Sequence, residues 1–506
     1  MRNMSWPTRM NKIDAKRLAS LIKNEYRFMG KYGRLGKNTI LVFIGNIGSK
    51  LIYLLLLPFY TRHLSADEFG STDLITVYAT VLMGIVSCCI YDSVFIFPKD
   101  RSDFRKRKYF SSAAAFCAAV TALCALAAAL INIAAQYGFA HGFFVDNVWA
   151  IMGMMTAMFV QQTVQQFTRA IDRIAVYSIT GIVQTAAVAL FAFLLIPDMG
   201  ISGYVLSCMG GGFAAALFSF VCSGARRYLR LRDIDHVALT EMLRYSVPLI
   251  PNSIMMFLLS MFNRPVLEYF TGLTAVGVFA VAYRIAGTAN VVFMVFQQAW
   301  LISAMEESRK EGYERFYNQM LKMVVTVQIV YAVALTAAGR LIVELFTTPD
   351  YFEACIFIPM LTAGVVFGNI AGFVGTNFAT TRKSKYYFYS TVWSGVASVL
   401  LNFVLIPLFG IWGACWSLLV SQAVNMVMRI VYSQRIVKIN DLVFAVWSVI
   451  LLAANIVTSY FVENLAFRCV LFASILLILG YMCRDSIIYI VNILKSRTRN
   501  EQKISH

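Results

Sequence analysis

The sequence predicts an all-α polytopic membrane protein with about fourteen transmembrane helices, in two parallel six-helix lobes plus two C-terminal helices. Three observations lead to this fold class. The chain of 506 residues is 59% hydrophobic and 14% charged, which is more apolar surface than a soluble domain can bury. Continuously apolar runs, each long enough for one helical crossing of about 20 residues, recur from residue 39 to residue 490. The third observation is a phrase that occurs twice at a fixed spacing.

The predicted elements follow one another with short connections. A basic cytoplasmic segment is expected at 1–38, without a cleavable signal peptide, because the first apolar run is long enough to remain as a span. The first lobe, 39–222, holds predicted spans at 39–61, 72–97, 109–135, 148–168, 174–197 and 200–222. A polar linker at 223–244 separates it from the second lobe. That lobe, 245–434, holds spans at 245–270, 274–302, 319–341, 354–381, 386–407 and 411–433. The last part, 435–492, holds spans at 441–462 and 466–490, and a cytoplasmic tail follows at 493–506.

The distribution of charge predicts the orientation. The net charge is +18, and Lys and Arg gather in the N-terminal segment, in "KDRSDFRKRKY" and "RKSK", in the linker and in the tail. All of these segments lie on one side if the spans alternate. The positive-inside rule then places both termini in the cytoplasm. Attraction to the lipids of the anionic inner leaflet explains the basic excess, so nucleic acid is not an expected partner. The N-terminal segment is either an amphipathic surface helix or a solvated tail.

The repeated phrase predicts the internal symmetry. "LLIPDMGISGYVLS" begins at Leu194 and "VLIPLFGIWGACWS" begins at Val404, and their prolines, Pro197 and Pro407, are 210 residues apart. Six predicted spans separate the two phrases. An even number of crossings restores the original direction, so the halves are parallel repeats related by an axis along the membrane normal. Transporters built from such repeats place the substrate between the lobes, although the repeat by itself also fits a fold without transport.

Ionisable residues inside the predicted spans indicate the class of cargo. A basic side chain in the bilayer costs about 2.5–3.5 kcal/mol on insertion scales, so it calls for a partner or a wet cavity. Lys50, Arg264 and Arg284 are predicted to lie in such a cavity, with Asp92 as the one deep acid. This imbalance favours an anionic cargo such as a diphosphate or a carboxylate. Internal pairing is the alternative, with Arg264 bound to Glu268 and Lys50 bound to Asp92.

Amide side chains extend the predicted polar surface of the cavity. Gln161 and Gln165 share one face of their helix, and Gln162 and Gln166 share another. Amides suit sugar hydroxyls, although hydrogen bonds between helices account for many amides in membranes without any ligand. The predicted polar cavity residues besides Asp92 are Asn46, Gln161, Gln165, Gln297, Gln298, Asn369 and Gln422.

Motifs for catalysis are absent from the sequence. It contains no P-loop, no HExxH and no GxSxG, and its four histidines are isolated. We therefore expect a transporter rather than an enzyme, with no metal site and no cofactor. The coupling ion, H⁺ or Na⁺, is not specified by these residues. A polysaccharide polymerase or ligase would be expected to carry a large outer loop, whereas the longest predicted one, near 136–147, is short.

Several stretches resemble a known family. "NTILVFIGNIGSKLIYLLLLPFYTRHLSADEFGSTDL", which begins at Asn38, resembles the first span and outer turn of bacterial polysaccharide-biosynthesis transporters. These are the O-antigen-flippase-like (Wzx-type) branch of the multidrug/oligosaccharidyl-lipid/polysaccharide exporter superfamily. "YSVPLIPNS" resembles the start of that family's second lobe, and the repeated "LIP…GI.G" resembles its lobe-closing turns.

The resemblance implies a V-shaped fold, like that of the multidrug exporters of this superfamily, and a flippase function. Its cargo would be undecaprenyl-diphosphate-linked oligosaccharide, carried to the outer leaflet, and the polysaccharide polymerase machinery is a further implied partner. The family's cationic central cavity would be matched by Lys50, Arg264 and Arg284. A cation-coupled multidrug exporter is the alternative, which would be expected to have acidic groups in the cavity.

Overall fold

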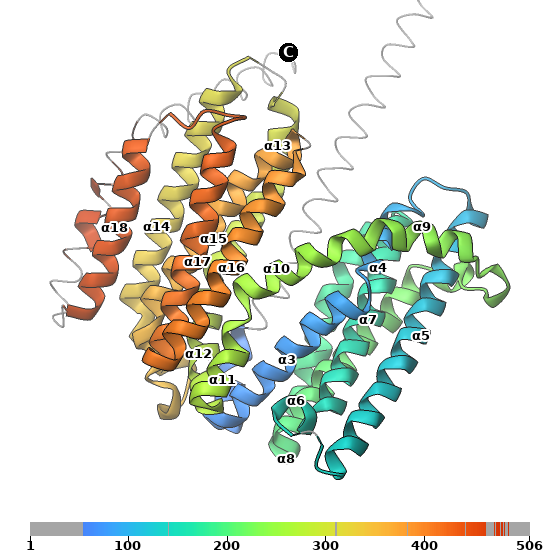
Figure 1. Cartoon of the computed structure of the whole chain (residues 1–506). Helices are drawn as coiled ribbons and strands as arrows, with labels where there is room; N and C mark the ends of the chain where they lie inside the picture. The colour runs from blue at the N-terminus through green and yellow to red at the C-terminus, as the bar shows by residue number, and fades with distance from the viewer. Residues whose placement is uncertain are drawn as a thin grey trace, which may run out of the picture.

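The structure is a computed structural model that describes residues 54–461 except 140, 309–310, 382 and 441, together with 470, 472–475, 477–478, 480 and 484. Within these residues all regular structure is helical, and nine helices are long and apolar enough to cross a membrane. The helices form two groups that meet at one end and diverge toward the other (Figure 1). The predicted all-α, two-lobe membrane fold is therefore confirmed.

The first lobe contains helices up to the polar linker. Its helices are α2 (Leu57–His63), α3 (Ala66–Val86), α4 (Ile90–Ile96), α5 (Asp103–Gln136), α6 (Phe143–Asp146), α7 (Val148–Ala170) and α8 (Ile174–Cys222). A capping box starts α3, in which the Ser65 hydroxyl accepts from the Glu68 amide and the Glu68 carboxylate accepts from the Ser65 amide. The predicted second span is broken between α3 and α4, where Cys88 and Cys89 have φ angles of 52° and 51°.

The second lobe begins after the linker. Most of α9 (His236–Ser246) belongs to the linker, and the helices of the lobe itself are α10 (Ile250–Ser260), α11 (Asn263–Thr271), α12 (Leu273–Ala286), α13 (Thr288–Glu307), α14 (Tyr313–Phe346), α15 (Ala354–Thr380), α16 (Ser384–Phe409) and α17 (Ile411–Ser433). A 3₁₀ turn at Val247–Leu249 marks the kink expected from Pro248. A last described helix, α18 (Leu442–Phe461), packs against α14 and α15.

The repeated phrase forms the same turn in both lobes. Gly200 has φ 53° and ψ −123°, and Gly410 has φ 56° and ψ −127°. Gly200 lies at a kink inside α8 and Gly410 lies between α16 and α17, and each follows the helical segment that contains the proline of the phrase, Pro197 or Pro407. Side chains of L-residues do not fit this backbone conformation, which explains why glycine stands at both positions.

Replacing Gly410 with Ala is expected to destabilise the protein by about 1–3 kcal/mol, because Ala must adopt a backbone conformation that only Gly adopts freely. Gly200→Ala should have the same effect in the first lobe. The midpoint of thermal unfolding of the purified protein in detergent measures this. The matched control is Gly339→Ala in α14, where a Cβ would meet Ile358 at an ordinary 3.6 Å. Equal midpoints for the Gly410 and Gly339 variants would contradict the prediction.

The two lobes touch through a pair of glycines. A Cβ on Gly70 of α3 would collide with the Leu273 carbonyl of α12, and a Cβ on Gly277 of α12 would collide with the Ala66 carbonyl of α3. The contact is thus reciprocal between equivalent helices of the two lobes. The Thr274 hydroxyl also donates to Asp67 across the same contact. We call this end of the molecule the closed end.

The basic connections lie at the opposite end, where the lobes diverge (Figure 1). We call it the basic end, and it carries the start of α5 and the linker. The linker is bound to the first lobe there, since Lys108 Nζ lies 2.8 Å from Asp235 Oδ2 and Tyr109 donates to Glu241 at 2.8 Å. The hydrogen bond from the Lys108 ammonium lowers the pKa of Asp235. The linker is therefore fixed to the first lobe, while α10 runs on to the second.

Candidate functional site

A cavity of about 760 Å³ is lined by residues of both lobes. Helices of the second lobe, from α10 to α17, form most of its wall, and Asp73 of α3 belongs to the first lobe. Three arginines, Arg264, Arg284 and Arg429, line it, whereas Asp73 is its one acidic residue among the described residues. We call it the cationic cavity.

Arg264 links the two lobes at the wall of this cavity. Its Nε lies 2.8 Å from Asp73 Oδ2, and both side chains are largely buried. The guanidinium also donates to the Ser260 carbonyl at 3.2 Å and lies 4.6 Å from the centre of the Tyr283 ring. The sequence suggested a pair between Arg264 and Glu268, whereas in the structure Arg264 pairs with Asp73 of the other lobe. Asp73 was not predicted as a cavity residue because it lies at the edge of its predicted span, 72–97.

Arg284 is held by aromatic rings rather than by an acid. Its guanidinium carbon lies 4.9 Å from the centre of the Phe69 ring and 5.8 Å from that of Tyr60, both from the first lobe. Its Nη1 is buried and has no hydrogen-bond partner in the described part of the chain. Cation–π contacts stabilise the arginine, and no described carboxylate lies at ion-pair distance from it. A buried donor without a partner is unfavourable, so this atom suits an anionic ligand.

Arg429 is the third cavity arginine, and sequence analysis missed it. Its side chain is 2% exposed, and it donates to the Ala371 carbonyl at 2.8 Å and to Ser390 Oγ at 3.3 Å. It also stacks 4.0 Å from the centre of the Tyr387 ring. Among the described residues its hydrogen-bond partners are all neutral. Arg429 lies near the end of a predicted span, where a cation usually flanks the membrane, so it was not predicted to line the cavity. Its separation of about two helical turns from Gln422 does place both side chains on one face of the helix.

Amides complete the wall of the cationic cavity. The predicted residues Gln297, Asn369 and Gln422 all line it, together with Asn425. Asn369 is already bound, because it donates to Gln328 at 3.0 Å and to the Ala289 carbonyl at 3.3 Å. The side-chain oxygens of Gln422 and Asn425 are buried and have no hydrogen-bond donor among the described residues. These two oxygens can accept from the hydroxyls of a ligand.

Other predicted site residues lie elsewhere. Gln161 donates to Gln165 at 2.6 Å, and Gln165 donates to the Tyr177 carbonyl of α8 at 3.1 Å, so this pair serves helix packing and lines neither large cavity. Asp92 is half-buried in α4 and also lines neither. Lys50 and Asn46, and the side chain of Gln298, lie outside the described residues, so their assignment stays a prediction.

A second cavity, of about 480 Å³, lies beside the first between α3, α7 and α10. Three residues, Met256, Ser260 and Met261, line both cavities, so the two are adjacent. Gln162 and Gln166, rather than Gln161 and Gln165, face this second space. Its described lining contains no Asp, Glu, Lys, Arg or His, and we call it the neutral cavity.

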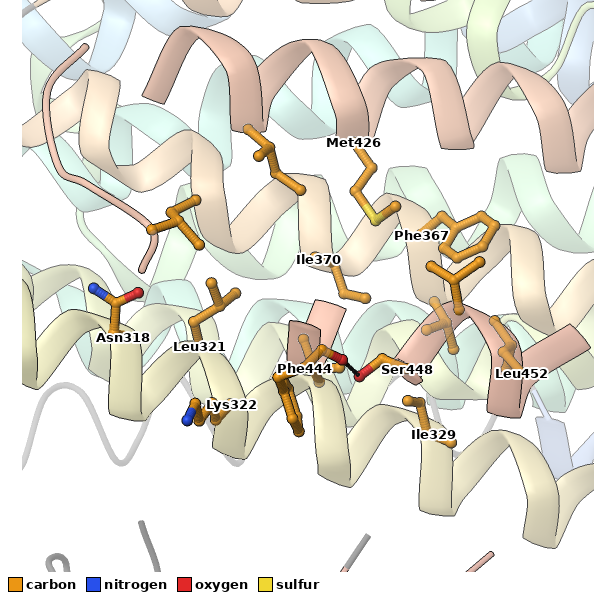
Figure 2. A pocket seen from close by; sticks show the side chains of 15 residues that line it. Asn318, Leu321, Lys322, Ile329, Phe367, Ile370, Met426, Phe444, Ser448 and Leu452 are labelled. Atoms are coloured by element: carbon orange, nitrogen blue, oxygen red, sulfur yellow. Dashed lines mark hydrogen bonds between the residues drawn. The ribbon is translucent and has the colours of Figure 1, made fainter. Parts of the chain in front are cut away.

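A third, small pocket of about 80 Å³ separates α18 from α14, α15 and α17 (Figure 2). Its lining is almost entirely apolar, with Ile329, Phe367 and Leu452 pointing into it (Figure 2). The hydrogen bond drawn there joins Ser448 to the Phe444 carbonyl within α18 at 2.7 Å. The pocket therefore offers mainly an apolar packing surface for α18.

The Asp73–Arg264 pair is expected to couple strongly in a double-mutant cycle. Asp73→Asn should destabilise the protein by about 1.5–3 kcal/mol, because it leaves a buried guanidinium without its carboxylate. The double variant D73N/R264Q should recover part of that loss, since the unpaired charge is gone. Thermal unfolding of the four proteins in detergent measures the cycle. The exposed pair Arg340–Glu344 provides the control, with an expected coupling below about 1 kcal/mol. Additive losses at Asp73 and Arg264 would contradict the prediction.

Comparison with known proteins places this geometry in a family. The family described as "Polysaccharide biosynthesis protein" matches residues 35–305, more than half of the chain. Among curated proteins, the multidrug export protein MepA of Staphylococcus haemolyticus (strain JCSC1435) is 26% identical over 168 residues. That match covers 32% of this chain and 37% of the relative, so the chain spans little more than a third of that protein's length.

Three solved structures share the fold. The lipid II flippase MurJ, in an inward closed conformation, matches with a TM-score of 0.64 and 13% identity, over 89% of this chain and 99% of that one. An inward-facing multidrug resistance MATE transporter matches with a TM-score of 0.59 and 16% identity, over 80% of this chain and 95% of that one. A MOP superfamily transporter from Pyrococcus furiosus matches with a TM-score of 0.56 and 14% identity, over 80% of this chain and 96% of that one. At these identities the likeness concerns the fold alone.

Proposed function

The chain belongs to the family of polysaccharide biosynthesis proteins, and we propose that it is a flippase for undecaprenyl-diphosphate-linked oligosaccharide. It would carry these repeat units across the bacterial plasma membrane for the assembly of a surface polysaccharide, such as O-antigen, capsule or exopolysaccharide. A polysaccharide polymerase would then consume the product on the outer side. The likeness to a protein named lipid II flippase supports a lipid-linked cargo.

The observation that carries this proposal is the charge of the cationic cavity. Three arginines face it, and its one described acid, Asp73, is already bound to Arg264. Arg284 and Arg429 have no carboxylate at ion-pair distance in the described part of the chain. A diphosphate offers several anionic oxygens to such guanidinium groups, which bind phosphate through paired hydrogen bonds. The cargo would thus neutralise charges that the protein leaves unpaired.

The direction of transport follows from the distribution of basic residues. With the basic end in the cytoplasm, as the positive-inside rule favours, the lobes would meet on the outer side and the cationic cavity would face inward. Cargo would enter from the cytoplasmic leaflet and bind the arginines. The lobes would then separate at the closed end, around the contact between Gly70 and Gly277. No cofactor is proposed, and either H⁺ or Na⁺ would serve as a coupling ion.

A cation-coupled multidrug exporter is the alternative function, and the similarity to MepA supports it. Cationic drugs are attracted by acidic side chains, because opposite charges steer and hold a ligand. The described lining of the cationic cavity instead carries a net positive charge, which repels a cationic drug. The charge of the cavity therefore favours the anionic cargo over a cationic drug.

Transport by the purified protein distinguishes the two functions. The protein is reconstituted in liposomes that contain a fluorescent undecaprenyl-diphosphate-linked oligosaccharide, and a membrane-impermeant quencher is added outside. The proposal predicts that the protein makes the inner-leaflet lipid accessible to the quencher, with or without a Na⁺ or pH gradient. Uptake of ethidium driven by such a gradient, without movement of the lipid, would support the exporter and overturn the flippase.

A further inference from the structure

The neutral cavity contains amide groups without partners. Gln162 and Gln166 lie one helical turn apart on α7, and Asn252 lies across from them on α10. None of the three side chains makes a hydrogen bond to a described residue, and the Oε1 atom of Gln166 is buried. Each carboxamide offers two donors and one acceptor. The cavity thus presents polar groups that require a polar ligand or water.

The remaining lining gives the chemical class of that ligand. Methionines supply much of the apolar wall, and Tyr91 and Phe257 add aromatic rings. No residue with a formal charge at neutral pH lines the cavity among the described residues, so neither an anion nor a cation is favoured there. A sugar combines hydroxyls, which pair with amides, with C–H faces, which pack on methionines and aromatic rings. The lining therefore matches a neutral, hydroxyl-rich ligand.

The position of the neutral cavity connects it with the arginines. Met256, Ser260 and Met261 form the boundary that both cavities share. These residues lie on α10 or directly after it, so a ligand whose diphosphate lies near Arg264 would reach the neutral cavity by extending past the end of α10. The volume of about 480 Å³ falls within the range of about 300–1,000 Å³ that is typical of small-molecule sites.

We propose that the neutral cavity binds the sugar residues next to the diphosphate, with Gln162, Gln166 and Asn252 as the residues that select the glycan. This inference rests on the proposed flippase function and adds a second subsite to it. Charge holds the diphosphate in the cationic cavity, and neutral hydrogen bonds recognise the sugars in the neutral cavity. The two subsites make separable contributions to binding.

The test compares two ligands on one set of variants. The full-length protein is embedded in nanodiscs of phosphatidylcholine, and binding is measured for undecaprenyl diphosphate and for the lipid-linked oligosaccharide pool extracted from the native host. The double variant Q162L/Q166L removes the amides and keeps the side-chain size. Asn252→Leu is the second, independent variant. The matched control is Q161L/Q165L, which changes the same helix on the face that packs against α8.

We expect wild-type protein to bind the lipid-linked oligosaccharide about tenfold more tightly than undecaprenyl diphosphate, because a few neutral hydrogen bonds to the sugars provide a gain in binding free energy of that size. Q162L/Q166L should lose this difference and keep its affinity for undecaprenyl diphosphate, whereas folded Q161L/Q165L should retain both. Equal wild-type affinities for the two lipids, or equal losses for both in Q162L/Q166L and Asn252→Leu, would overturn the glycan subsite. Failure of wild-type protein to bind undecaprenyl diphosphate would instead overturn the proposed function.

Discussion

Replacing Arg284 with Met is expected to reduce transport of the lipid-linked oligosaccharide by about 10- to 100-fold. The change removes a hydrogen bond to a charged group that is worth about 1.5–3 kcal/mol, and each 1.4 kcal/mol corresponds to a factor of ten. Arg284 should show this loss clearly because its Nη1 lacks any described hydrogen-bond partner and no described carboxylate lies at ion-pair distance from it. The measurement is the initial rate of transport in liposomes at equal protein density.

The controls separate the cavity charge from charge in general. Arg340→Met removes an arginine that is 80% exposed near the closed end of α14, and it should transport at the wild-type rate. Arg284→Lys should fall between wild type and Arg284→Met, since an ammonium keeps the charge but not the paired donors of a guanidinium. Arg429→Met should resemble Arg284→Met. Equal transport by the Arg284→Met and Arg340→Met variants would contradict the role of the cavity arginines.

Replacing Gly277 with Ala is expected to open the closed end and stop alternation between the two states. The new Cβ would meet the Ala66 carbonyl of α3, and backbone atoms cannot move aside as a flexible side chain can. Overpacking of this kind costs about 1–3 kcal/mol, which shifts the balance between closed and open states by about 5- to 150-fold. Gly70→Ala should act in the same way, because it faces Leu273 across the same contact.

Chemical labelling from outside the cell measures this shift. A cysteine is placed at Gln422 in a variant without other cysteines, and its reaction with a membrane-impermeant maleimide is followed in intact cells. The rate should rise in the Gly277→Ala protein and stay low in Gly339→Ala, where the added methyl has space. An unchanged labelling rate with normal transport in Gly277→Ala would show that the glycine contact does not close the outer side.

Sequence was sufficient for the fold because the relevant signals are local and repeated. Apolar runs specify helices in a membrane, and the phrases around Pro197 and Pro407 specify equivalent turns, which the structure shows with Gly200 and Gly410 in matching conformations. Breaks without glycine or proline could not be predicted in this way. The turn at Cys88 and Cys89 has a left-handed conformation although neither residue is a glycine, so the residue types there do not predict it.

Sequence was less informative about the site, because a helical period says which residues share a face and not where that face points. Gln161 and Gln165 were correctly paired with each other, yet it is Gln162 and Gln166 that face a cavity. Arg264 and Arg284 were predicted to share a cavity and do so. The acid that binds Arg264 is Asp73, which lies 191 residues away in the chain, a separation over which sequence spacing carries no information.

The most direct test of the account is whether the cationic cavity recognises the diphosphate itself. Binding of undecaprenol, undecaprenyl phosphate and undecaprenyl diphosphate is measured on the full-length protein in phosphatidylcholine nanodiscs, at low and high salt. The account predicts affinity that rises with the number of phosphates, by about tenfold or more between undecaprenol and the diphosphate, and a loss of that preference in the double variant R284M/R429M. Equal affinity of the wild-type protein for all three lipids would contradict it.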